Sequence, residues 1–175
     1  TLSSSSVSTA DNTTFTFGLT LSGTSNGAEI LTLTGTVYDN VGNNTAISTG
    51  VQFNDLTSPI FSSVSPSTNS SVNTTAVGYT LSEVIASGSV TWRHESGTAD
   101  GASPHTANLT GDELNTGTRA SAVLTNEPTL VDGAIYTIEF NGTDAAGNQA
   151  TEVSVTGITF DTTPPPFSSV SPSTN

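Results

Sequence analysis

The sequence predicts an all-β protein made of antiparallel, two-layer β-sandwich repeats of about 106 residues arranged in tandem. One basis is composition: Ser and Thr supply about a third of the 175 residues, and Thr favours strands because its β-branched side chain fits a pleated surface. Another is that few segments carry the mixture of Leu, Glu, Lys, Arg and Gln typical of a surface helix. The strongest is internal repetition, which sets the period.

The repeat is marked by nine residues, Phe-Ser-Ser-Val-Ser-Pro-Ser-Thr-Asn, which begin at Phe61 and recur unchanged from Phe167. The offset between the two copies is 106 residues. Two shorter pairs recur at 105 or 106 residues: Asn26-Gly27-Ala28 with Asp132-Gly133-Ala134, and Asp39-Asn-Val-Gly-Asn43 with Asp144-Ala-Ala-Gly-Asn148. A period of this length matches one seven-stranded sandwich of roughly 100 residues.

This period divides the chain into three segments. We expect residues 1–57 to be the C-terminal part of one repeat, containing its last three strands (E, F and G). Residues 58–163 are expected to form one complete repeat, and residues 164–175 the first strand of the next. Because the chain starts and stops out of phase with its repeats, we expect it to be a piece of a longer array.

The first segment can be aligned with the complete repeat in two ways. The preferred alignment, supported by the spacing from the Asn-Gly turn to Asp39, leaves one apolar face bare unless another copy supplies the missing strands. The alternative matches Asn12-Thr-Thr with Asn73-Thr-Thr and makes the segment a shortened domain. The strands expected in the first segment are Thr14–Leu21, Ile30–Tyr38 and Ala46–Phe53.

The complete repeat contains seven segments that are typical of strands and are separated by turn residues. The expected strands are 59–64, 74–82, 88–94, 104–109, 119–125, 134–143 and 151–160. Alternation in the last of them predicts that Val153, Val155, Ile158 and Phe160 face the core, with a bulge at Gly157 that switches the phase. Trp92, on the third strand, is expected to pack between the two sheets.

Charge and composition exclude several classes of partner. The formal net charge is −13, and Arg93 and Arg119 are the two basic residues, so neither nucleic acid nor an anionic membrane surface is an expected partner. The absence of Cys excludes disulfides and thiolate metal sites. No apolar run approaches the roughly 18 residues of a membrane span. The acidity either keeps an extracellular chain soluble or supplies ligands for cations, and composition leaves both interpretations open.

Three motifs of the complete repeat resemble a known family. They are Thr143-Asp-Ala-Ala-Gly-Asn148 after the sixth strand, Phe160-Asp-Thr-Thr-Pro-Pro165 after the seventh, and Thr80-Leu-Ser-Glu-Val84 at the end of the second. Together they resemble the bacterial immunoglobulin-like tandem repeats of giant cell-surface adhesins, over all of residues 58–163 and more loosely over 1–57. The resemblance implies an immunoglobulin-like sandwich, secretion to the cell surface and, in many such proteins, calcium at the junctions between domains.

Topology supports a calcium site independently, because alternate loops of an antiparallel sandwich return to the end at which the chain enters. Clustered carboxylates repel one another, and Ca²⁺ relieves the repulsion by taking about six to eight oxygen ligands. At that end Asp112 and Glu113 are weaker candidates. The alternative interpretation of the Asp-Ala-Ala-Gly-Asn motif is a tight turn held by its own Asp and Asn side chains. The hypothetical junctional Ca²⁺ ligands are Asp55, Glu83, Asp144 and Asn148, with Asp161 assigned to the next junction and Asp39 to the previous one.

We do not expect this chain to be an enzyme. His94 and His105 lack a third ligand with motif spacing, and the Ser-rich segments contain no nucleophile elbow. We expect a stalk or extender of a surface adhesin, whose partners are neighbouring copies of the repeat and a host or environmental surface. The alternatives are a filament or sheath subunit, assembled with other chains by strand complementation, and a glycan-binding adhesin tip.

Overall fold

The computed structural model describes residues 2–9, 15–21, 23, 25–38 and 41–166. Strands dominate this part of the chain, and its one helical element is the 3₁₀ turn η1 (Gly111–Leu114), so the prediction of an all-β protein is confirmed. No helix in these residues has the length and apolar character needed to cross a membrane. The chain divides into two compact units, Thr1–Thr57 and Ser58–Asn175.

The first unit contains two antiparallel hairpins. Strand β1 (Leu2–Thr9) pairs with β2 (Phe15–Leu21), and β3 (Ile30–Tyr38) pairs with β4 (Asn44–Gln52). The three strands expected here are present within two residues of their expected ends. Strand β1 was not expected, because Leu-Ser-Ser-Ser-Ser-Val-Ser-Thr lacks apolar alternation and its extended form depends on pairing with β2. The assignment of this unit to the end of a repeat stays a prediction.

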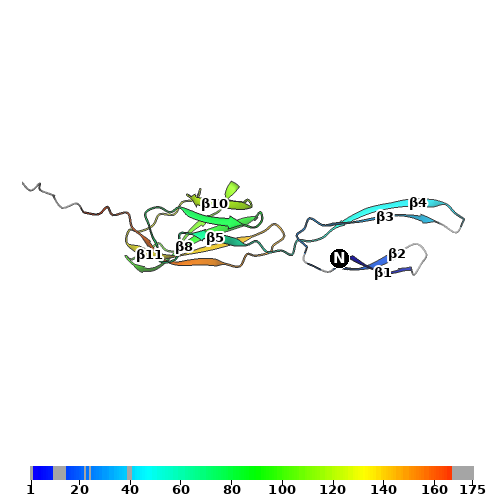
Figure 1. The fold of residues 1–175 in the computed structure, drawn as a ribbon, viewed down its shortest axis with the longest axis horizontal. Helices are drawn as coiled ribbons and strands as arrows, with labels where there is room; N and C mark the ends of the chain where they lie inside the picture. The colour runs from blue at the N-terminus through cyan, green and yellow to red at the C-terminus, as the bar shows by residue number, and fades with distance from the viewer. Residues whose placement is uncertain (1, 10–14, 22, 24, 39–40, 167–175) are drawn as a thin grey trace, which may run out of the picture. The chain divides into compact units, whose positions relative to one another are not determined.

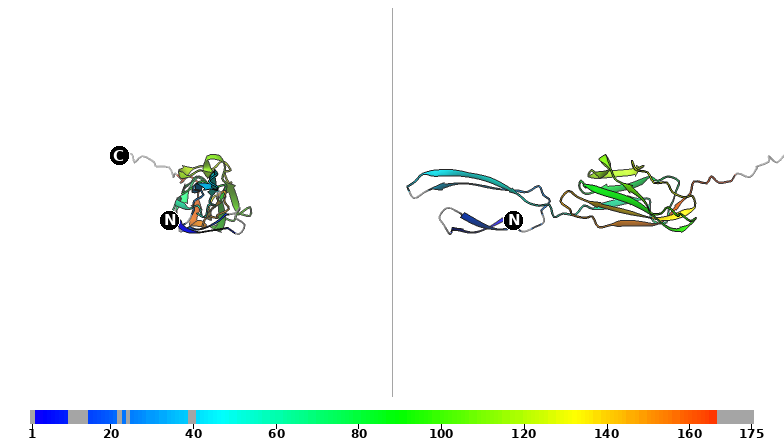
Figure 2. Two further views of the ribbon diagram at one scale, coloured as in Figure 1. Left: turned by 90° about the vertical axis from the view of Figure 1, so that its right-hand side faces the viewer. Right: turned by 180° about the vertical axis from the view of Figure 1, so that it is seen from behind.

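The second unit is a sandwich of two sheets (Figures 1 and 2). All seven expected strands are present, within three residues at each end, and a short β6 (Ser71–Val72) adds a parallel pair with β12. The smaller sheet has the order β10 (Gly117–Ala122), β7 (Val77–Leu81), β5 (Phe61–Ser65). The larger has the order β6, β12 (Val153–Phe160), β11 (Ala134–Thr143), β8 (Ser87–Gly97), β9 (His105–Asn108).

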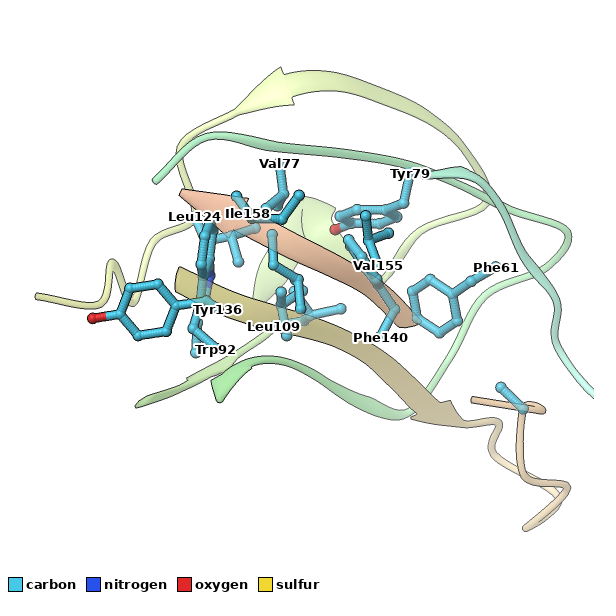
Figure 3. Close-up of a cluster of buried hydrophobic side chains, with 14 of the residues drawn as sticks. Phe61, Val77, Tyr79, Trp92, Leu109, Leu124, Tyr136, Phe140, Val155 and Ile158 are labelled. Atoms are coloured by element: carbon cyan, nitrogen blue, oxygen red, sulfur yellow. The ribbon is translucent and has the colours of Figure 1, made fainter. Parts of the chain in front are cut away.

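The core lies between these two sheets and is built by alternation along each strand. Every second residue of β11 is fully buried, from Ala134 to Phe140. Trp92 is also fully buried, as predicted, and its ring meets the edge of Tyr136 with centroids 6.0 Å apart. Figure 3 shows this pair at one end of the core, with Phe61 and Phe140 at the other. Complete burial of each such side chain stabilises the fold by roughly 1.5–3 kcal/mol.

The predicted bulge in β12 is present at Gly157. Its backbone has φ +71°, and the register between β11 and β12 shifts just opposite it. The shift lets Val155 and Ile158 both face the core, with exposures of 4% and 0%, although they are three positions apart in the strand. Phe160 is buried, and the partly buried Val153 packs against the core, so the predicted inward set is confirmed.

The chain enters and leaves the second unit at opposite ends (Figure 1). Strand β5 begins at Phe61 beside Leu81, at the end we call proximal. Strand β12 finishes beside the start of β11, where the Gly133 amide donates to the Phe160 carbonyl over 2.7 Å, at the end we call distal. The second copy of the nonapeptide, residues 167–175, lies outside the described residues, and with it most of the strand expected at 164–175.

Candidate metal centre

Two loops of the sandwich bring carboxylates together at its proximal end. Glu83 lies in the loop between β7 and β8, and Asp144 begins the loop between β11 and β12. Strand pairing sets this convergence, because Thr143 at the end of β11 lies opposite Ser87 at the start of β8. A carboxylate oxygen of Glu83 and one of Asp144 lie within 4.8 Å of each other.

The Asp144 side chain is held by its own turn. Its Oδ1 accepts the backbone amide of Asn148 and its Oδ2 accepts the Asn148 side-chain amide, each over 2.8 Å. Gly147, at φ +93°, allows the chain to reverse between them. The tight-turn interpretation is therefore confirmed, and Asn148 acts here by orienting the carboxylate.

Asp144 is ionised in this setting although it is 6% exposed. Burial by itself raises its pKa, but the hydrogen bonds from the Asn148 side chain and backbone outweigh burial and leave the pKa below its ordinary value. A buried, ionised carboxylate close to a second acidic group is an unfavourable arrangement that a divalent cation relieves. Two carboxylates offer up to four oxygens, so a Ca²⁺ ion here needs further oxygens from backbone, water or a third acid.

The remaining predicted ligands are placed as follows. Asp55 belongs to the first unit. Its backbone forms an isolated antiparallel β-bridge with Asn26, and its Oδ1 accepts the Thr57 amide over 2.9 Å. Asp161 lies at the distal end, away from Glu83 and Asp144, and its Oδ1 accepts the Thr163 amide over 3.0 Å. Asp39 lies outside the described residues.

The two weaker candidates are occupied with local structure. The Glu113 carboxylate accepts the backbone amides of Thr110 and Thr125, which caps η1 and ties down the loop after β10. These bonds hold the pKa of Glu113 below its ordinary value against the opposing effect of burial. Asp112 accepts the side-chain amide of Asn115. Neither carboxylate belongs to the group around Glu83 and Asp144.

A second polar cluster, at the distal side of the sandwich, was missed by the sequence analysis. Asp100 Oδ2 accepts the Tyr136 hydroxyl and contacts His105 Nε2, both over 2.6 Å. The Tyr136 oxygen in turn accepts the Val131 amide over 3.0 Å, so the cluster ties two loops to β11. In the sequence, Asp100 is followed by Gly101, a pair that is typical of any loop and does not indicate which residues the Asp side chain contacts.

The cluster shifts the pKa values of Asp100 and Tyr136 in opposite directions. The hydrogen bond from Tyr136 lowers the pKa of Asp100 to about 2, against the effect of burial and with help from His105. Burial, with the bond to Asp100, raises the pKa of Tyr136 to about 12. His94 lies nearby and pairs with the Thr98 carbonyl over 3.0 Å. Neither histidine belongs to the group around Glu83 and Asp144.

Comparison with known proteins adds no assignment. No protein-family model matches the chain, and no curated protein does. The resemblance to bacterial immunoglobulin-like repeats is therefore carried by the motifs quoted above.

Proposed function

We propose that this chain is a structural part of an extracellular tandem array of immunoglobulin-like repeats, acting as the stalk or extender of a large surface adhesin. The observation that carries the proposal is that the chain enters the sandwich at its proximal end and leaves at its distal end. Sandwiches joined in this way extend end to end, and each added copy lengthens the array.

Local geometry that recurs at the period of the repeat supports the same proposal. Gly27 and Gly133, 106 residues apart, have φ +77° and +75°. The turn formed by Asp55 and Thr57 also recurs at that offset, because Thr163 donates its amide to Asp161 in the same way. Gly42 and Gly147, 105 residues apart, both have φ +93°.

The test is to lengthen the chain with two, four and eight copies of residues 58–163 and to measure the maximum dimension by small-angle X-ray scattering. A stalk predicts a linear increase of roughly 35–40 Å for each copy, set by strands of about ten residues and their loops. A maximum dimension that grows much more slowly would show that the copies fold back on one another, and would overturn the proposal.

We also propose that Ca²⁺ binds at the junction, with Glu83 and Asp144 as ligands and Asp55 as the third acid. Ile60 is fixed to the proximal end, because it exchanges hydrogen bonds with Ser82, the neighbour of Glu83. Asp55 precedes Ile60 by five residues, so the chain tethers it within at most about 17 Å of that point. An ion bound by both units would stiffen the joint between consecutive repeats.

A thermal melt with Ca²⁺ or with chelator tests the ion. A site with a dissociation constant of about 0.1 mM gains about 1.4 kcal/mol at 1 mM Ca²⁺, which raises the melting temperature by about 5 °C. Glu83→Gln should abolish the rise, whereas Glu152→Gln, which removes an exposed carboxylate elsewhere, should keep it. Equal rises in both variants, or none in the unaltered chain, would remove Ca²⁺ from the proposal.

The alternative function is a subunit of an extracellular filament or sheath. The observation that favours it is the β3–β4 hairpin, whose nine-residue strands pair in unbroken register and form a two-stranded sheet within the described residues. Long regular edges of this kind accept a further strand from another chain. Sedimentation velocity separates the two functions: a stalk stays monomeric as concentration rises, whereas a filament subunit grows.

A further inference from the structure

A shallow polar hollow lies on the outer face of the larger sheet of the sandwich, toward the proximal end. Its volume is about 260 Å³. The walls come from β8, β9, β11 and the loop after β11. The residues that line it are Ser87, Gly88, Ser89, Asn108, Asn141, Gly142, Thr143 and Gln149.

Strand register arranges the lining side chains in two rows. Ser89 lies opposite Asn108 on one side and Asn141 on the other, which forms a row across three strands. Ser87 lies opposite Thr143, which pairs with Gln149, and these form the next row. Because neighbouring strands are about 4.8 Å apart, the rows present a regular grid of polar groups on a rigid sheet.

The chemistry of the lining selects a class of ligand. None of the lining side chains is charged, in a chain whose net charge is −13, so the hollow does not fit an ionic ligand. None is apolar or aromatic, so it does not fit a lipid or an apolar side chain. Each Ser, Thr, Asn and Gln side chain both donates and accepts hydrogen bonds, which matches the hydroxyl groups of a sugar.

The polar groups of the hollow are available for such bonds. Asn141 Oδ1 accepts the Gly142 amide over 2.8 Å. Within the described part of the chain, no hydrogen bond engages the side-chain amide of Asn108 or Gln149, or the hydroxyl of Ser89. These groups can replace bound water with a ligand without losing any hydrogen bond that holds the fold.

We propose that this hollow binds a neutral carbohydrate through the hydroxyl groups of one sugar residue. Its volume falls below the roughly 300–1,000 Å³ of pockets for larger ligands, which matches a single residue of a glycan. Without an aromatic ring for stacking, hydrogen bonds are the main source of affinity, so a monosaccharide binds in the millimolar range. The proposal is independent of the stalk function, because a sandwich without a ligand still extends an array.

The test is an amide NMR titration of the ¹⁵N-labelled full chain with the neutral methyl glycosides of glucose, galactose, mannose and N-acetylglucosamine, each to about 50 mM. At least one should give saturable shifts confined to amides around Ser89, Asn108 and Asn141. Asn108→Ala should weaken binding about fivefold through the loss of one hydrogen bond. Ser89→Leu fills the hollow and should abolish binding.

The matched control is Ser154→Leu, which places the same side chain on the exposed face of β12, outside the hollow, and should bind as the unaltered chain does. The amide spectrum away from the hollow verifies that each variant is folded. The proposal is overturned if none of the four glycosides shifts these amides. It is also overturned if the shifts persist in Ser89→Leu, or if glucuronic acid binds the unaltered chain and Ser89→Leu equally.

Discussion

Asp100 is the centre of the polar cluster that contains Tyr136 and His105. Its carboxylate joins Tyr136, on the buried face of β11, to His105, at the start of β9. The side chain of Asp100 is 2% exposed, so water does not replace either partner. A single acid thus connects the loop after β8 to both neighbouring strands.

The folded state should therefore lose stability in acid as Asp100 is protonated. Its pKa lies near 2 in the fold, below the ordinary value of 3.8, so its contribution is complete above about pH 4 and disappears as the pH falls through about 2. Asp100→Asn should flatten this part of the profile of unfolding free energy against pH, measured with urea. Asp112→Asn, which removes an exposed acid with one side-chain partner, is the control for the loss of one carboxylate. A profile for Asp100→Asn that overlays the unaltered chain would contradict this role.

At the scale of one element, the bulge decides which residues of β12 reach the core. A regular strand would turn Val155 and Ile158 to opposite faces, because side chains alternate at every residue. Gly157 removes this conflict with a positive φ that L-residues rarely adopt. A Cβ at this position would also collide with the side chain of Asn69.

Gly157→Ala should accordingly destabilise the second unit by more than about 1 kcal/mol, since strain and collision add to each other. Gly101→Ala is the matched control, because a Cβ there meets nothing within 4 Å, and it should change stability by less than about 0.5 kcal/mol. Urea unfolding followed by the fluorescence of Trp92, the single Trp of the chain, measures both. Equal stabilities for the two variants would show that β12 does not depend on the bulge.

At the scale of the whole molecule, the described core belongs to one unit. Among the side chains that the structure describes, the buried hydrophobic cluster runs from Phe61 to Phe160 and includes none from the first unit. The first unit instead exposes large apolar side chains, with Ile30 at 63% and Tyr38 at 65%. The hydrophobic stabilisation that the described side chains account for therefore resides in the sandwich.

Residues 58–166 alone should fold. In the presence of chelator, their melting temperature, followed by the fluorescence of Trp92, should agree with that of the full chain within about 2 °C. Chelator removes any contribution of a bound cation, so the comparison reports the core. A fall of about 10 °C or more in the shorter chain would mean that the first unit contributes substantially to the stability of the sandwich.

Ten of the strands, the inward set of β12, its bulge and the buried Trp92 could be predicted from the sequence. These features are local, because a strand alternates at every residue and one Gly is enough to switch the phase. It also identified Glu83 and Asp144 as candidates, since antiparallel order returns their loops to one end. Whether they bind Ca²⁺ stays a prediction.

Contacts between residues that are distant in the sequence could not be predicted, because they depend on how the strands pair and pack. The bond between Asp100 and Tyr136 joins residues 36 apart, and β1 and β6 are strands because of their partners rather than their own sequence. The rows of the polar hollow likewise depend on register across three strands. Periodicity tells which face a side chain takes, whereas its neighbours on that face are set by the free energy of packing the whole sandwich.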